Sequence, residues 1–220
     1  MSHHFNRALK LTAAASIAAA IAVHFISRPL LLWTFAPLAT LLILAIALAN
    51  WAARKNSYSL WISIGLLFSL AGDVLLLRSD HFFTLGLSAF LLTHIAYLVA
   101  FTRDTPFPAR LSAWSLFLLF AASCYFFLFS WLPSALQIPV AVYAVLLVSM
   151  AAQAMGRYLK LRTASTQFAA IGGLLFVLSD SLLAFDRFYK PLPLAPLLVL
   201  LPYYAAQWLI ASSTDNSLPS

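Results

Sequence analysis

Two aspartates lie inside long apolar stretches of this 220-residue sequence. Asp73 occurs within LAGDVLLL, and Asp180 occurs within VLSDSLLAF. Placing an ionisable side chain among lipid-spanning helices costs at least about 2.5 kcal/mol on insertion scales, so such residues are functional candidates by default. If two carboxylates share a pocket of low dielectric, desolvation and their like charge keep one protonated while the other stays ionised. The two aspartates could therefore act together as a general acid and a general base.

Small residues accompany both aspartates at helical spacing. Gly65, Ser69 and Asp73 recur every four residues, and the glycine pair at 172–173 shares a helical face with Asp180. Small side chains let membrane helices approach closely, so we expect both carboxylates to face the interior of a helix bundle. A second interpretation remains open, in which two unrelated aspartates near helix ends reach water or cap a neighbouring helix.

Other polar side chains lie in the same apolar stretches and could support the two carboxylates. His94 and Tyr97 are one helical turn apart, and counted from Phe82 the histidine lies about 18 Å into its stretch, which is deeper than expected for a catalytic partner. In hydrocarbon these groups need hydrogen-bond partners, so they either line the site or join helices together. The supporting candidates are Ser69, His94, Tyr97, Ser179, Ser181, Tyr203, Tyr204 and Gln207.

Other catalytic templates are missing from the sequence. It contains no GxSxG, no HExxH, no phosphate-binding glycine loop and only one cysteine, Cys124. His3, His4 and His81 fall outside the apolar stretches, so only His24 and His94 remain, too few for a zinc hydrolase built on three histidines. We therefore expect neither a metal site nor a cofactor.

The composition requires that the elements positioning these groups lie in a membrane. Hydrophobic residues make up 63% of the chain and charged residues only 9%, whereas soluble domains are about a quarter charged. Thirteen Lys and Arg stand against six acids, and they lie between apolar stretches rather than in a patch with interleaved aromatic residues. A water-soluble fold and a nucleic-acid partner are therefore excluded.

Eight apolar stretches have about the 20 residues that a helix needs to cross a bilayer. We expect an all-α fold, a polytopic membrane helix bundle of about eight transmembrane helices in a single domain over residues 1–220. Arg7 and Lys10 before the first stretch could mark a secretory signal, but its many alanines favour a permanent helix. The predicted spans are approximately 9–27, 30–50, 57–77, 82–102, 111–131, 136–156, 164–185 and 191–212.

The cations predict the orientation of the bundle. Nine lie on the side of the N-terminus, and four lie on the other side. Because cytoplasmic loops carry the excess of Lys and Arg, we expect a multi-pass protein of a bacterial inner (plasma) membrane with both termini in the cytoplasm. Both aspartates then lie about 6 Å below the outer boundary. The nine are Arg7, Lys10, Arg54, Lys55, Arg103, Arg110, Arg157, Lys160 and Arg162, and the four are Arg28, Arg78, Arg187 and Lys190.

Four segments in order resemble the YhhN family of transmembrane lysoplasmalogenases. They are GDVLLL, GLSAFLLTHIAYLVAF, GGLLFVLSDSLLAFDRF and YYAAQWLIASS, and the similarity covers about residues 60 to 212. The resemblance implies an eight-helix membrane hydrolase that cleaves the vinyl ether bond of lysoplasmalogens to a fatty aldehyde and a glycerophospho-alcohol. It also implies that Asp73 and Asp180 are the catalytic pair.

The residues suit this ether hydrolase chemistry independently of the resemblance. A vinyl ether is hydrolysed by protonation of its β-carbon and attack of water on the resulting oxocarbenium ion, which needs one acid and one carboxylate. Arg78, Arg187 and Lys190 follow the aspartates and could bind the phosphate of a lysophospholipid substrate. Membrane lipid is the other expected partner, and a homo-oligomer is left open.

Two alternatives to a hydrolase stay open. A small-molecule or proton-coupled transporter would stagger its acids through the bilayer, whereas here the two are expected at one depth. A scaffold subunit without chemistry is the second alternative. Trapping of the aldehyde product distinguishes all three.

Overall fold

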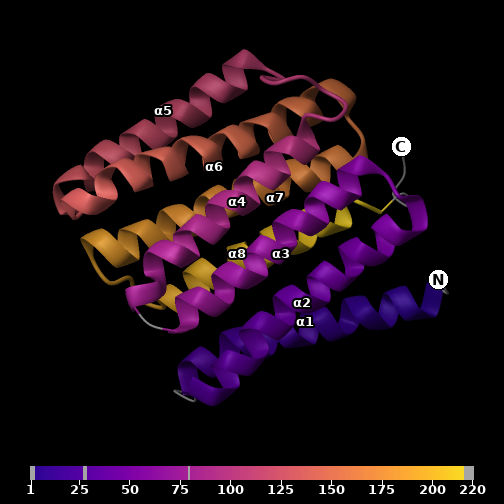
Figure 1. The fold of residues 1–220 in the computed structure, drawn as a ribbon, viewed down its shortest axis with the longest axis horizontal. Coiled ribbons are helices and arrows are strands. Elements are labelled where there is room, and N and C mark those ends of the chain that lie inside the picture. Colours follow the sequence, from indigo (N-terminus) through magenta and orange to yellow (C-terminus); the bar gives the residue numbers. More distant parts are fainter. Residues whose placement is uncertain (1–2, 27–28, 79, 216–220) are drawn as a thin grey trace. The chain divides into compact units, whose positions relative to one another are not determined.

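The computed structural model describes residues 3–26, 29–78 and 80–215, with side chains for 11–23, 34–78 and 81–215. All regular structure in these ranges is helical, which confirms the predicted all-α fold (Figure 1). Three short helical turns, η1 (Asp80–Phe82), η2 (Phe129–Trp131) and the π-helical η3 (Phe185–Tyr189), join some of the long helices. The eight long helices are α1 (His3–Ile26), α2 (Pro29–Arg54), α3 (Ser57–Arg78), α4 (Phe83–Phe101), α5 (Leu111–Leu128), α6 (Ser134–Leu161), α7 (Ala164–Ala184) and α8 (Ala195–Ser212).

The helices form two compact units, Met1–Ala100 and Phe101–Ser220. In the first unit α1 packs on α2, and α2 packs on α3. In the second unit α5 packs on α6, α6 on α7, and α7 on α8. In each of these pairs the two helices are neighbours in the sequence, as expected where connections are short.

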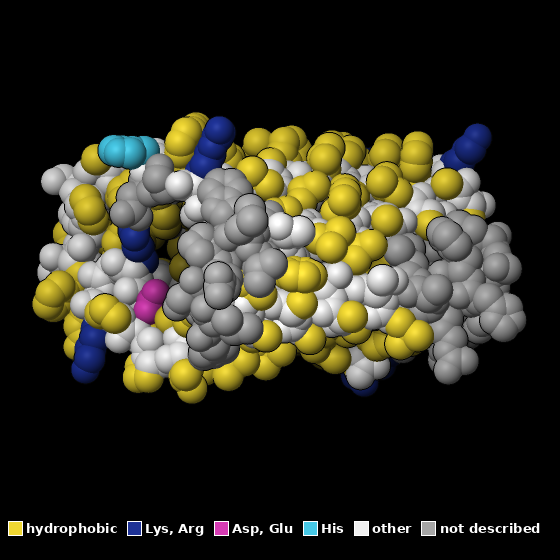
Figure 2. Space-filling view, turned by 90° about the horizontal axis from the view of Figure 1, so that it is seen from below, with side chains coloured by type: hydrophobic (Ala, Val, Ile, Leu, Met, Phe, Trp, Pro, Cys, Tyr) yellow, Lys and Arg dark blue, Asp and Glu magenta, His cyan; other side chains and the backbone are white. Residues whose placement is uncertain are grey.

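Among the described residues, seven helices are long and apolar enough to cross a membrane. The apolar stretch of α1 in which side chains are described, Leu11–Val23, is shorter. On the face drawn in Figure 2, hydrophobic side chains predominate and charged ones are few. Leu116, Leu119 and Phe126 of α5, for example, are 67%, 65% and 74% exposed, which water disfavours and lipid tolerates. The chain is a multi-pass membrane protein.

The apolar stretch predicted over 191–212 is helical only from Ala195. Pro191 and Pro193 lie just before it, and a proline restricts the residue that precedes it to extended conformations. Leu194 then turns the chain with φ 56°, and α8 begins with Pro196 in its first turn, where a missing N–H costs nothing. The prolines therefore delay the start of the helix.

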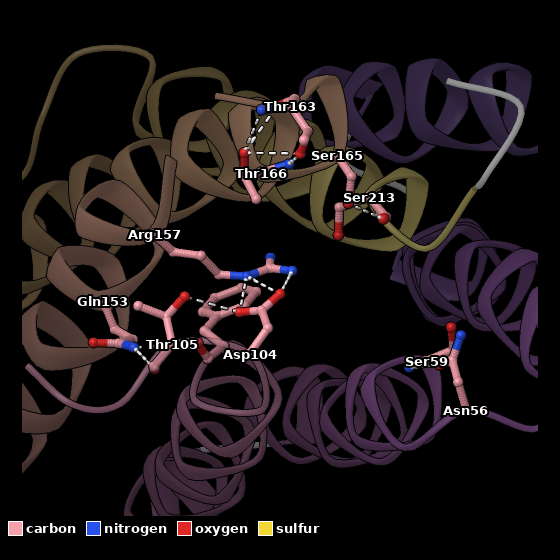
Figure 3. A network of polar contacts seen from close by, with 11 residues as sticks. Asn56, Ser59, Asp104, Thr105, Gln153, Arg157, Thr163, Ser165, Thr166 and Ser213 are labelled. Carbon is pink, nitrogen blue, oxygen red and sulfur yellow. Dashed lines mark hydrogen bonds and ion pairs between the residues drawn. The ribbon is translucent and has the colours of Figure 1, made fainter. Parts of the chain in front are cut away.

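Two tight connections are held by side-chain caps (Figure 3). Between α2 and α3, Lys55 adopts φ 51° and the Asn56 side-chain oxygen accepts a hydrogen bond from the Ser59 N–H at 2.8 Å. Between α6 and α7, Arg162 adopts φ 53°, and the Thr163 and Thr166 side chains cap each other's backbone N–H groups. These caps satisfy N–H groups that helix starts leave open.

The connection from α4 to α5 is tied to α6 by polar contacts (Figure 3). The Gln153 amide, 1% exposed, donates to the carbonyls of Phe101 at 3.1 Å and Thr105 at 2.7 Å. Arg157 Nε donates to both carboxylate oxygens of Asp104, at 2.7 and 2.9 Å. Partial burial raises the pKa of Asp104, but the hydrogen bonds and charge of Arg157 outweigh it, so the pKa lies below its ordinary value of 3.8.

Candidate active site

Asp73 lies five residues before the end of α3 and is half-buried. Its Oδ2 accepts a hydrogen bond from Thr40 Oγ1 at 2.5 Å. Thr40 belongs to α2 and is completely buried, so the packing of α2 on α3 holds the hydroxyl at the carboxylate. One conformation of Asp73 is thereby selected.

A cluster of polar side chains joins α3 to α4 within the first unit. The hydroxyls of Ser69 and Thr93 lie 3.1 Å apart, and Thr93 donates to the Gly65 carbonyl at 3.1 Å. Tyr97 forms a hydrogen bond with Ser69. A side chain at position 65 would collide with the Tyr97 ring, so the glycine is what allows this ring to lie between the two helices. Ser69 and Tyr97 thus belong to one cluster that joins α3 to α4, and their support of Asp73 stays a prediction.

His94 is also completely buried and follows Thr93 on α4. Asp73 is half-buried on α3. The structure therefore places His94 in the same unit as Asp73, in the helix that supplies Tyr97.

Asp180 lies in the last turn but one of α7 and is half-buried. Its Oδ2 accepts a hydrogen bond from Tyr143 Oη at 2.5 Å. Tyr143 belongs to α6, the helix that precedes α7 in the chain, just as Thr40 belongs to the helix that precedes α3. Each of the two units thus contains one intramembrane aspartate held by a hydroxyl from the preceding helix.

The two adjacent glycines of α7 face two different neighbouring helices rather than one. A Cβ at Gly173 would lie 3.1 Å from Ala151 Cα of α6, and one at Gly172 would lie 2.7 Å from Ile210 Cγ1 of α8. Consecutive helical residues point about 100° apart, so one glycine opens each side. Gly173 brings α6, which carries Tyr143, close to α7.

The aromatic and amide side chains of α8 pack beside α7. Tyr203, Tyr204 and Gln207 are 5%, 1% and 0% exposed, and the Tyr203 ring meets Phe176 of α7 edge-on, with centroids 5.7 Å apart. Ser179 Oγ donates to the Val199 carbonyl at 2.9 Å, which uses this serine to join α7 to α8. Ser181 is half-buried.

The three cations expected to bind phosphate are exposed. Arg78 ends α3 and lies over the Phe82 ring at 5.4 Å. Arg187 lies in η3, and Lys190 follows it directly. The rings of Phe127, Phe185 and Tyr189 pack against one another at this end of the second unit, an arrangement typical of the membrane interface.

Sequence reasoning missed Thr40 and Tyr143. Both are hydroxyl residues within apolar stretches, the same signal that singled out His94 and Tyr97. Their partners lie 33 and 37 residues away, and which helices pack together is a property of the tertiary structure. Within the part of the chain that the structure describes, no group of three or more His, Cys, Asp or Glu could hold a metal ion.

Comparison with known proteins gives consistent matches. A model of the YhhN family matches residues 31–214. Lysoplasmalogenase TMEM86A of Bos taurus is 37% identical over 161 residues, covering 71% of this chain and 65% of that relative. Lysoplasmalogenase TMEM86B of Sus scrofa is 36% identical over 163 residues, covering 74% of this chain and 66% of that relative. The matched stretches span just under two thirds of these relatives, and no solved structure matches significantly.

Proposed function

Because the chain belongs to the YhhN family, we propose that it is a membrane hydrolase that cleaves the vinyl ether bond of lysoplasmalogens. The products are a fatty aldehyde and a glycerophospho-alcohol. The observation that carries this proposal is the likeness to two relatives named lysoplasmalogenase, at 37% and 36% identity. The two hydroxyl-bonded aspartates supply groups that suit the reaction.

The proposed reaction uses one aspartate as an acid and the other as a base. The protonated carboxyl transfers its proton to the β-carbon of the vinyl ether, and the double-bond electrons form the new C–H bond. The ionised carboxylate stabilises the oxocarbenium ion and removes a proton from the attacking water. The hemiacetal then collapses to aldehyde and alcohol as its hydroxyl proton passes to the departing alcohol oxygen. The proton that the base took from water returns to the acid through solvent, which restores both carboxyl groups.

The proposed orientation places both termini in the cytoplasm of a bacterial inner membrane. Lys55, Arg103, Lys160 and Arg162, four cations of the expected cytoplasmic side, are exposed. Arg78, Arg187 and Lys190 then lie at the outer boundary, where a vinyl ether meets its glycerol phosphate. Their charge suits a phosphate group.

The deciding experiment measures aldehyde release. The purified full-length chain in lipid nanodiscs is incubated with a lysoplasmenyl phospholipid, and the aldehyde is trapped with a hydrazine reagent. We expect stoichiometric aldehyde and glycerophospho-alcohol from this lipid and none from the matched saturated-ether lysolipid. A transporter or a scaffold protein forms no aldehyde from either lipid, and that result would overturn the proposal.

A further inference from the structure

The hydrogen bonds to the two aspartates come from chemically different hydroxyls. Thr40 and Tyr143 each donate to an Oδ2 atom, at 2.5 Å in both cases. We propose that both are positioning residues of the proposed hydrolase and that they assign different roles to the two aspartates. Tyr143 keeps Asp180 ionised, and Thr40 orients Asp73, which is the proton donor. This inference rests on the proposed function and adds to it which aspartate is the acid.

The division of roles follows from what each hydroxyl can do. A phenol is a stronger donor than an aliphatic alcohol, and its oxygen is a weaker acceptor because a lone pair is delocalised into the ring. Tyr143 therefore stabilises a carboxylate, which only accepts hydrogen bonds, more than a carboxylic acid, which must also donate. The Thr40 hydroxyl can accept a hydrogen bond from protonated Asp73 and donate one to Asp73 after its proton has left.

The packing of the helices fixes both bonds. A Cβ at Gly173 would lie 3.1 Å from Ala151 Cα, so the glycine allows α7 to pack closely on α6, which carries Tyr143. Thr40 is completely buried between helices, where an alternative partner in water is out of reach. The two hydroxyls are thus preorganised rather than recruited by substrate.

Other charged and titratable groups lie on the elements that pack against or follow the helix of each aspartate. For α7, which carries Asp180, α8 contributes Tyr203 and Tyr204, and η3 contributes Asp186, Arg187 and Tyr189. Asp186 accepts the Leu192 N–H at 2.7 Å, and Tyr203 packs on Phe176. On the elements that carry or follow Asp73 in the first unit, α4 contributes His94 and Tyr97, α3 contributes Arg78 one turn further along, and η1 contributes His81, while Tyr58 lies at the opposite end of α3.

The test is the pH profile of kcat/KM for vinyl ether cleavage in single variants. In Tyr143→Phe we expect the acidic limb to move to higher pH by about one unit, the size of a lost hydrogen bond to a charged group. In Thr40→Val we expect an unmoved acidic limb and a rate about tenfold lower because the acid is no longer oriented. Thr40→Ser retains the hydroxyl and should restore most of the rate.

Tyr125→Phe is the matched control. Its hydroxyl, in the same unit as Tyr143, donates to the Gln137 carbonyl at 3.2 Å, so the variant loses the same atom away from the site. We expect its profile to match that of the wild type. Replacing Tyr143 with 3,5-difluorotyrosine is a second variant that retains the bond with a stronger donor, and it should move the acidic limb to lower pH.

The outcomes separate the role division from the proposed function. Acidic limbs that stay in place in both Tyr143 variants, or a limb that moves in Thr40→Val instead, overturn the division while the hydrolase stands. A wild-type protein that forms no aldehyde overturns the proposed function itself, and the division with it. Opposite shifts in the two Tyr143 variants, with the control unchanged, support the assignment of Asp180 as the ionised partner.

Discussion

Each intramembrane aspartate of this protein is held at one carboxylate oxygen by a neighbouring helix, Asp73 by Thr40 and Asp180 by Tyr143. Both carboxylates are half-buried in a chain whose exposed surface is largely apolar. Burying such groups costs free energy that a purely structural role would not repay, since a leucine would fit the membrane better. Two carboxylates at these positions suit the proposed acid–base chemistry.

The first prediction concerns the carboxylates themselves. Asp73→Asn and Asp180→Asn should each reduce kcat/KM for vinyl ether cleavage by about three orders of magnitude, because an amide has the same shape but exchanges no proton. The double variant should be little worse than either single one, as for groups that act as a unit. His94→Ala should lose less activity. Near-normal turnover by either Asn variant, with the helix content of the wild type, would contradict the paired mechanism.

At the scale of elements, side chains of α6 contact both an earlier connection of the chain and the helix that follows α6. Gln153 and Arg157 hold the connection between α4 and α5, while Tyr143 reaches α7. Arg157 is 7% exposed and forms its ion pair with Asp104, which is 43% exposed (Figure 3). Because the guanidinium is largely buried, removing Asp104 would leave its charge without a carboxylate partner.

The second prediction follows from the lowered pKa of Asp104. A carboxylate whose pKa is lower when folded stabilises the protein above its ordinary value of 3.8, and this stability is lost as the pH falls through the folded pKa. Because Asp104 is partly exposed, we expect about 1 kcal/mol, or about 3 °C in Tm. Thermal unfolding should show Asp104→Asn below the wild type at pH 7 and equal to it near pH 2. A Tm difference of the same size at both pH values would contradict the ion pair's contribution.

At the scale of the whole molecule, the distribution of charge predicts the side of the membrane on which the proposed reaction takes place. The excess of Lys and Arg on the side of the N-terminus predicts which membrane face each aspartate approaches. Topology therefore decides from which leaflet a lysolipid would reach the proposed site.

The third prediction is that both termini lie in the cytoplasm. A reporter that is active only in the cytoplasm should be active when it is fused after Ser220, and a periplasmic alkaline phosphatase fused there should be silent. The reverse pattern would place both aspartates near the inner leaflet instead. A fusion after Arg187, in the opposite connection, provides the control with the opposite expectation.

The fourth prediction concerns the pH dependence and the lipid selectivity of the proposed reaction. If one must be protonated and the other ionised, kcat/KM should follow a bell in pH whose limbs belong to the pair. Lysolipids with an acyl ester should resist cleavage, because ester hydrolysis calls for a nucleophile and oxyanion donors. Equal rates on ester and vinyl ether lipids, without a falling alkaline limb, would indicate an acyl hydrolase.

The all-α fold class, the approximate helices and the two aspartates as candidate catalytic residues can all be predicted from the sequence. Helices in a bilayer satisfy their backbone hydrogen bonds internally, so length and hydropathy suffice to find them, and ionisable groups stand out against an apolar background. The sequence could not predict that Thr40 and Tyr143 form hydrogen bonds with the carboxylates, or that Gly172 and Gly173 face different helices. Apolar helices offer many equivalent faces, so which pair meets is decided by side-chain packing between residues far apart in the chain.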